Sequence, residues 1–304
     1  MKMPNFLIIG AAKAGTTALY NYINQHPQVF MSSEKEPHFF AFEGEKVNFS
    51  GTAGEKEWLN RNAITDINLY QQQFRDVSKE TAIGEASALY LYIPKAAERI
   101  RHHIPEVKLI TILRNPVERA YSAFIFQKRD GLEPDLDFAQ ALAAEEWRRQ
   151  NNWVPIYYYQ HMGFYYHQLK RYFDLFPQEQ IKVYLHDDFT SNPLSVLQDA
   201  FRFLGVDDTF NPNMSARHNV SGIPKNKVLH EFLRAESHPV KTLLKPLIPK
   251  KLRRSVMLNL HNNNLEKATP LSQDIRQQLS ELYEEDILKL QDLIQKDLSK
   301  WLPK

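Results

Sequence analysis

The first residues that could do chemistry lie in a loop of small residues near the start of the chain. The segment 10–17, Gly-Ala-Ala-Lys-Ala-Gly-Thr-Thr, follows an apolar run and precedes a helical pattern. Backbone N–H groups of such a loop point to the N-terminus of the next helix, where they bind phosphate or sulfate. Gly10 and Gly15 have the spacing of a nucleoside-triphosphate loop, but Thr16 stands where that loop has its lysine, and Lys13 lies upstream. The loop therefore predicts an anion site that differs from a standard NTPase site.

A second candidate anion site begins at Arg114, directly after the β-rich run 107–113. Asn115 and Pro116 are typical of an N-cap and a first helical position, and the helix that they begin would carry Ser122. A planar guanidinium at the carboxyl end of a strand suits a phosphate group. This position therefore favours an anionic ligand at Arg114. Arg119 could contribute, or it could pair with a carboxylate.

The elements that position these residues alternate between strands and helices. We expect strands at 6–9, 81–87, 107–113 and 180–185, and helices at 18–24, 117–128, 165–176, 193–204 and 272–298. This alternation predicts an α/β fold, with a parallel sheet covered by helices on both faces. No linker or repeat divides the chain, so we expect a single domain over residues 1–304.

Several of these segments resemble one family. Residues 13–19, Lys-Ala-Gly-Thr-Thr-Ala-Leu, resemble the 5′-phosphosulfate loop of sulfotransferases that use 3′-phosphoadenosine 5′-phosphosulfate (PAPS), and residues 113–122 resemble the family's 3′-phosphate motif. Residues 34–40, Glu-Lys-Glu-Pro-His-Phe-Phe, are similar to the stretch that carries the acid/base glutamate in the glycosaminoglycan-type branch. Residues 282–302 are similar to the family's C-terminal helix. The resemblance thus spans nearly the whole chain.

The resemblance implies a P-loop-like fold, PAPS as co-substrate with the bisphosphate PAP as product, no metal, and roles for named residues. Glu36 would be the general base and Lys13 would stabilise the leaving group, while His38 and Glu85 are rival bases. Pro37 predicts an extended backbone at Glu36. The resemblance departs at Ala86, where glycosaminoglycan enzymes have a lysine. The residues expected to hold the nucleotide are Lys13, Ala14, Gly15, Thr16, Thr17, Arg114 and Ser122, with Asn219, Ser221, Gly222 and Lys225 from a loop that closes over it.

Composition limits the other functions. The chain of 304 residues has 38 Lys and Arg against 36 Asp and Glu, a net charge of +2 that argues against a general nucleic-acid coat. It has no cysteine, which excludes disulfides, thiolate zinc sites and Cys nucleophiles and is compatible with a reducing compartment. The early apolar run 6–12 is too short to span a membrane and lacks a signal-peptide pattern, so we expect a soluble, cytoplasmic protein.

Residues 237–265 contain no acidic residue. This basic stretch is either a solvated surface or a rim that attracts an anionic acceptor or contacts a membrane surface without insertion. We expect the aromatic cluster between Trp153 and Tyr166 to divide between the core and an acceptor cleft.

The sequence predicts a sulfotransferase that acts on a small-molecule, glycan or lipid acceptor, by transfer to a hydroxyl or less readily an amine. The alternatives are a nucleotide kinase or NTPase, and an inactive nucleotide- or polyanion-binding protein. The oligomeric state is not indicated.

Overall fold

The computed structural model describes residues 2–135, 137–215, 222–226, 264–266 and 268–303. Its centre is a five-stranded sheet with the order β2-β3-β1-β4-β5, and every neighbouring pair of strands is parallel. The strands are β1 (Phe6–Gly10), β2 (Val29–Met31), β3 (Ala82–Ala86), β4 (Lys108–Leu113) and β5 (Ile181–Leu185). All five residues of β1 are buried, as expected for a strand covered on both faces.

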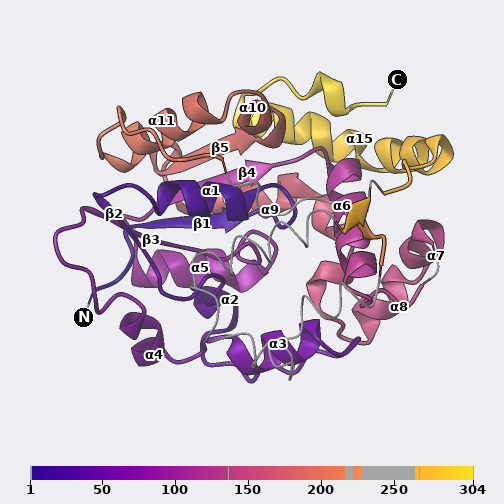
Figure 1. Cartoon of the computed structure of the whole chain (residues 1–304), viewed down its shortest axis with the longest axis horizontal. Coiled ribbons are helices and arrows are strands. Elements are labelled where there is room, and N and C mark those ends of the chain that lie inside the picture. The colour runs from indigo at the N-terminus through magenta and orange to yellow at the C-terminus, as the bar shows by residue number, and fades with distance from the viewer. Residues whose placement is uncertain (1, 136, 216–221, 227–263, 267, 304) are drawn as a thin grey trace.

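Helices cover both faces of this sheet (Figure 1). The crossover from β1 to β2 runs toward one edge, whereas those from β3 to β4 and from β4 to β5 run toward the other, so right-handed connections place their helices on opposite faces. On one side α1 (Thr16–Ile23) packs against α11 (Pro193–Leu204), and on the other α5 (Pro94–His103) packs against α9 (Tyr165–Leu175). The α/β fold class predicted from the sequence is therefore confirmed.

Two long helices close the side of the sheet near β4 and β5. α6 (Pro116–Arg129) begins where predicted, because the Asn115 side chain accepts hydrogen bonds from the amides of Val117 and Glu118 at 2.9 and 3.3 Å. α15 (Gln273–Ile294) packs on α9 and α6. Its Asp286 accepts a hydrogen bond from the Tyr166 amide at 3.1 Å. The C-terminal helix is thereby fixed to the start of α9.

Shorter elements form the rim of the fold. They are α2 (Phe39–Phe42), α3 (Glu55–Asn62), α4 (Ile67–Gln72), α7 (Phe138–Ala143), α8 (Glu145–Gln150) and α10 (His186–Ser191), with 3₁₀ turns at Pro155–Tyr157, His161–Gly163, Gln178–Gln180 and Ser299–Trp301. A two-residue strand pair, β6 (Ile223–Pro224) with β7 (Leu265–Glu266), is antiparallel. Within the described residues, no helix is both long enough and apolar enough to cross a membrane.

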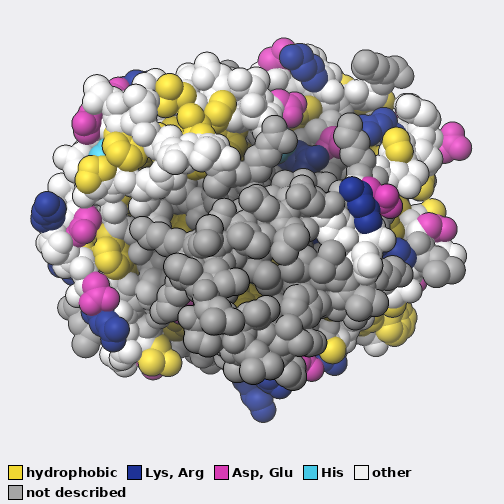
Figure 2. Space-filling model, viewed as in Figure 1, with side chains coloured by type: hydrophobic (Ala, Val, Ile, Leu, Met, Phe, Trp, Pro, Cys, Tyr) yellow, Lys and Arg dark blue, Asp and Glu magenta, His cyan; other side chains and the backbone are white. Residues whose placement is uncertain are grey.

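Charged side chains of both signs are interspersed over the described part of the face in Figure 2. The described residues on that face therefore form no continuous basic surface of the kind that nucleic acids bind.

Candidate active site

A cavity of about 510 Å³ opens at the carboxyl ends of β1 and β4, where parallel sheets bind ligands. It brings together candidate residues that are far apart in the sequence. Those that line it are Lys13, Gly15, Thr16, Thr17, Glu36, His38, Arg114 and Ser122. Ala14 is fully buried and does not line it.

The loop after β1 is shaped by left-handed backbone conformations. Lys13 has φ 70° and Gly15, at the N-cap of α1, has φ 107°. The Gly15 conformation favours glycine and lets the first turn of α1 face the cavity. The first amides of a helix have no acceptor within the helix, so they are available to an anion.

The Lys13 ammonium lies over the Phe126 ring, 3.6 Å from its centre. Burial, together with the positive charges of Arg129 and Arg114, lowers the pKa of Lys13 to about 7. The ammonium is therefore poorly compensated before a ligand arrives, and an anion in the cavity would favour its charged form.

Arg114, directly after β4, and Ser122, on α6, line the same cavity. The Arg114 side chain is 23% exposed, and its Nη1 is 3.5 Å from the Lys13 carbonyl oxygen. Its nearest carboxylate, that of Glu118, is 3.8 Å away, and Glu118 also pairs with Arg276 at 2.6 Å. Arg114 thus retains donors for a ligand, and Ser122 is on the face of α6 that lines the cavity.

Glu36 faces these cationic residues from the loop after β2. Its Oε1 accepts a hydrogen bond from Lys35 Nζ at 2.6 Å, and its Oε2 accepts one from the Ala88 amide at 3.1 Å. Burial alone would raise the pKa of Glu36, but Lys35, His38 and the Ala88 amide together lower it. Glu36 is therefore ionised at neutral pH, with 23% of its side chain exposed.

The expectation of an extended backbone at Glu36 is wrong, because its φ is 64°. The Glu36 amide donates to the Ala86 carbonyl at 3.0 Å, while its side chain turns back to the Ala88 amide. These two contacts hold the residue in a left-handed turn despite the following proline.

The two rival bases differ in their access to the cavity. His38 lines it, with Nε2 3.6 Å from Glu36 Oε2, and burial lowers the pKa of His38 to about 4. Glu85 is fully buried and does not line the cavity. It accepts hydrogen bonds from Ser87 Oγ at 2.9 Å and Tyr70 Oη at 3.2 Å, and burial raises its pKa to about 7. Ser87 Oγ in turn accepts from the His38 amide at 3.1 Å. Through Ser87, Glu85 therefore stabilises the loop that carries Glu36 and His38.

Arg119 and most of the aromatic cluster belong to the core. Arg119 is fully buried and donates to the Tyr159 carbonyl oxygen. Tyr157, Tyr159 and Tyr165 are fully buried as well. From this part of the chain, the cavity is lined instead by Val154 and Ile156, two aliphatic residues between the aromatic ones.

The late loop is only partly described. Asn219 and Ser221 lie outside the described residues, as do residues 237–263 of the basic stretch. Gly222 is buried and Lys225 is exposed, and neither lines the cavity. The Lys225 amide donates to the Asn264 carbonyl at 2.7 Å, next to the β6–β7 pair.

Sequence reasoning missed several lining residues: Lys35, Glu55, Trp58, Leu59, Leu89, Phe126, Val154, Ile156, His186 and Phe189. Phe126 could have been found, because it follows Ser122 by one helical turn on the same face of α6. Nothing in the sequence indicated that Glu55 and Trp58 line the cavity, because α3 carries no nucleotide-binding motif. Within the described chain, no group of three or more His, Asp or Glu side chains could hold a metal ion.

Comparisons with known proteins agree with this geometry. Residues 4–211 match the sequence model of the sulfotransferase family. The human bifunctional heparan sulfate N-deacetylase/N-sulfotransferase 3 is 30% identical over 217 residues, which are 67% of this chain and 22% of that protein. A membrane-associated sulfotransferase of Dictyostelium discoideum is 34% identical over 124 residues, 41% of this chain and 23% of that protein. The chain thus spans less than a quarter of the length of these curated relatives.

Solved structures are similar over nearly the whole chain. A sulfotransferase from Alicyclobacillus acidocaldarius is 33% identical, with a TM-score of 0.77 and 99% of both chains covered. A mouse sulfotransferase complexed with PAP is 14% identical, with a TM-score of 0.51, 96% of this chain and 86% of that chain covered, which shows the fold alone. The chain therefore belongs to the sulfotransferase family, as the resemblance of its loops predicted, and is a sulfotransferase enzyme.

Proposed function

We propose that the cavity binds PAPS and that the enzyme transfers its sulfuryl group to an acceptor hydroxyl, or less readily to an amine. One observation carries the proposal: the loop after β1, the Arg114–Ser122 pair and the Glu36 carboxylate line one cavity. The similar mouse sulfotransferase, which was solved with PAP, supports the choice of nucleotide. Names of curated relatives specify N-sulfotransferases, so transfer to an amine stays as the second option.

In this proposal the two phosphate groups have separate sites. Gly15, Thr16 and Thr17, with the N-terminus of α1, hold the 5′-phosphate through amides and hydroxyls. Arg114 and Ser122 hold the 3′-phosphate, for which a guanidinium provides paired donors. The nucleotide would thereby place its sulfuryl group between Lys13 and Glu36.

The reaction forms one bond to sulfur and breaks one. The acceptor oxygen attacks the sulfur in line, the bond between sulfur and the 5′-phosphate oxygen breaks, and PAP leaves with that electron pair. Glu36 takes the acceptor proton, and the Lys13 ammonium stabilises the negative charge that develops on the leaving oxygen. The enzyme contributes chiefly position and electrostatics, as in phosphoryl transfer. No step in this scheme requires a metal. The location of the protein in a reducing compartment, the cytoplasm, stays a prediction.

Thermal-shift measurements with three ligands test the nucleotide. We expect PAP to raise the melting temperature in the presence of EDTA, because ligands that bind the native state stabilise it by mass action. Preference for ATP with magnesium would identify a kinase or NTPase instead. Preference for heparin, with a steep loss in salt, would identify a polyanion-binding protein. Labelled PAPS with a fractionated cell extract would then reveal the acceptor by mass spectrometry.

A further inference from the structure

We propose that Arg129 and Asp130 are positioning residues that control the charge of Lys13 beside the Phe126 ring, and that Lys13 takes up a proton from solvent when the nucleotide binds. The inference rests on the proposed function, because it needs PAP to bind next to Lys13. It gives a role to the two charged residues at the C-terminal end of α6, beyond the 3′-phosphate motif at 113–122.

The Phe126 ring brings together cations from two separate segments. Lys13 Nζ, from the loop after β1, is 3.6 Å from the ring centre, and the guanidinium carbon of Arg129 is 4.6 Å from the same centre. Both cations are within the roughly 6 Å over which an aromatic face attracts a positive charge. Phe126 also lines the cavity. The ring therefore holds two like charges near each other at the wall of the proposed nucleotide site.

Arg129 forms an ion pair with the next residue, Asp130. Its Nε donates to Asp130 Oδ1 at 2.8 Å, and its Nη2 donates to Oδ2 at 3.3 Å. The two side chains are only 11% and 6% exposed. Solvent and salt screen charges weakly at this burial, so both members of the pair act on a neighbouring ammonium. They act in opposite directions, because one is a cation and the other an anion.

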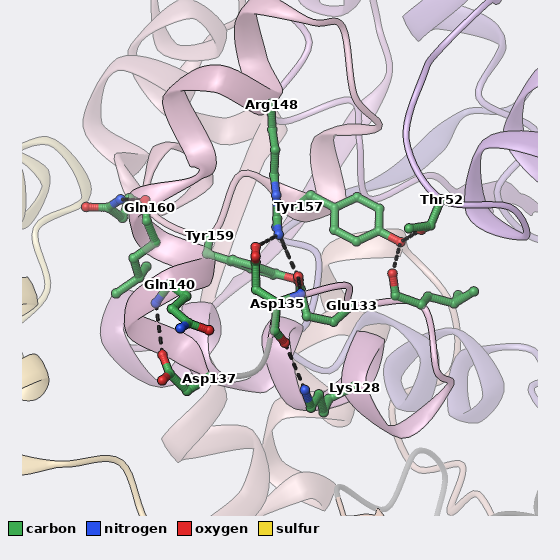
Figure 3. A network of polar contacts seen from close by, with 12 residues as sticks. Thr52, Lys128, Glu133, Asp135, Asp137, Gln140, Arg148, Tyr157, Tyr159 and Gln160 are labelled. Carbon is green, nitrogen blue, oxygen red and sulfur yellow. Dashed lines mark hydrogen bonds and ion pairs between the residues drawn. The ribbon is translucent and has the colours of Figure 1, made fainter.

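A buried network fixes the segment that follows this pair (Figure 3). Lys128 Nζ donates to the Asp135 carbonyl oxygen at 2.8 Å. Arg148 donates to the Glu133 carboxylate at 2.5 Å and also to the Asp135 carboxylate. The side chains of Arg148 and Glu133 are at most 1% exposed. The Arg129–Asp130 pair is therefore held in place before any nucleotide binds.

Charged groups from three elements act on Lys13. Burial lowers its pKa most and Arg129 comes next, whereas Asp130 raises it. Arg114, after β4, lowers the pKa as well, and Glu55, on α3, raises it. With a pKa of about 7, Lys13 is mostly uncharged at pH 8 in the free enzyme. The phosphates of a bound nucleotide would favour the ammonium, so binding at this pH draws a proton from solvent.

Two calorimetric measurements with PAP test the inference without an acceptor. Titrations in buffers of different ionisation enthalpy give the number of protons taken up on binding. We expect the wild type to take up most of one proton per PAP at pH 8, and Lys13→Met to take up none. Titrations over a range of pH give the midpoint at which PAP affinity begins to fall, with Lys13→Met as the reference at each pH. This midpoint does not depend on a uniform change in affinity.

The two members of the ion pair should move this midpoint in opposite directions. Arg129→Gln removes a like charge and leaves the Asp130 carboxylate near Lys13, so the midpoint should rise by about one pH unit. Asp130→Asn leaves the Arg129 charge uncompensated, so the midpoint should fall by about as much. The double variant with both changes should return close to the wild-type value. A purely structural role for the pair would not produce shifts of opposite sign.

The chain offers a matched control in Arg75 and Asp76, which have the same Arg-Asp sequence. Their side chains form an ion pair at 3.5 Å, but both are 74% exposed and neither lines the cavity. Arg75→Gln and Asp76→Asn should leave the midpoint unchanged. Arg129→Lys keeps the positive charge and should also stay near the wild-type midpoint, which separates the effect of charge from that of altered packing.

Three outcomes would overturn the inference. They are the absence of proton uptake in a wild type that binds PAP, shifts of the same sign in Arg129→Gln and Asp130→Asn, and equal shifts in the Arg75 and Asp76 variants. A wild type that does not bind PAP would instead refute the proposed nucleotide site, so the two failures are distinguishable.

Discussion

The affinity for PAP should fall as pH rises from 7 to 9, because Lys13 loses its charge in this range. Burial and neighbouring arginines lower the pKa of Lys13 to about 7. Its charged form, which attracts the phosphates, therefore predominates below pH 7 and is lost above it. Over the same range the phosphates of PAP are almost fully ionised, since their second pKa is about 6. Burial also lowers the pKa values of His38 and His186, so both stay neutral.

The size of the fall follows from two limits. With a pKa of about 7, the charged fraction of free Lys13 drops by roughly 50-fold between pH 7 and pH 9. A hydrogen bond to a charged group contributes about 1.5–3 kcal/mol, which corresponds to roughly 10- to 150-fold in affinity. The loss of affinity cannot exceed either the drop in the charged fraction of Lys13 or the contribution of its hydrogen bond. We therefore expect the dissociation constant of PAP to rise about 10- to 50-fold.

Calorimetry at constant ionic strength measures this change, and two variants isolate Lys13. Lys13→Met should bind PAP more weakly at pH 7 and show no further loss at pH 9. Lys13→Arg keeps its charge over the whole range, so its affinity should be nearly independent of pH. A flat profile in the wild type, or the same fall in Lys13→Met, would refute the role given to Lys13 and its pKa.

Three further predictions concern the other parts of the site. Glu36→Gln should slow transfer from labelled PAPS by roughly 10²–10⁴-fold without changing PAP affinity. The control Glu34→Gln, at an exposed position, should have little effect. Near-normal turnover of Glu36→Gln would show that another group is the base. Arg114→Ala should weaken the binding of PAP by roughly 10- to 100-fold in calorimetry, and Ser122→Ala should weaken it by less. Neither variant should bind AMP much more weakly than the wild type does. Equal losses of affinity for PAP and AMP would place the 3′-phosphate elsewhere. Burial raises the pKa of Glu85 to about 7, so the stability linked to its proton is present at low pH and lost as pH rises through 7. The stability of Glu85→Gln relative to wild type should therefore grow by up to about 3 kcal/mol from pH 5 to pH 8 in urea unfolding, and a constant difference would contradict this.

The sequence was sufficient to predict the elements that bear the nucleotide motifs. Four of the five central strands and the helices that follow the two motifs lie within a few residues of their expected positions. These elements have strong local signals, such as a short apolar run followed by a glycine loop or an Asn-Pro cap. The edge strand β2, Val29–Met31, was missed because three residues after a proline carry no strand pattern of their own.

The end of the cavity that α3 lines could not be predicted, because long-range contacts form it. Trp58 reaches the cavity since Ser50 and Thr52 are bonded to the 152–157 turn, about a hundred residues later in the chain. The aromatic residues that attracted attention near this turn are core residues, and the aliphatic Val154 and Ile156 line the cavity instead. A period in the sequence predicts which face of an element is apolar, but not which distant element will cover it.

Backbone conformation links the chemistry of this site to its stability. Five described non-glycine residues have a positive φ, and three of them, Lys13, Glu36 and His38, line the cavity. Such conformations cost about 1–3 kcal/mol each and persist only where other contacts enforce them. For Glu36 and His38 the enforcing contacts come from β3 and the turn after it, through the Ala86 carbonyl and Ser87 Oγ respectively. Ser87 is itself hydrogen-bonded to the buried Glu85, so a carboxylate that does not line the cavity stabilises the turn that carries His38, two residues after Glu36.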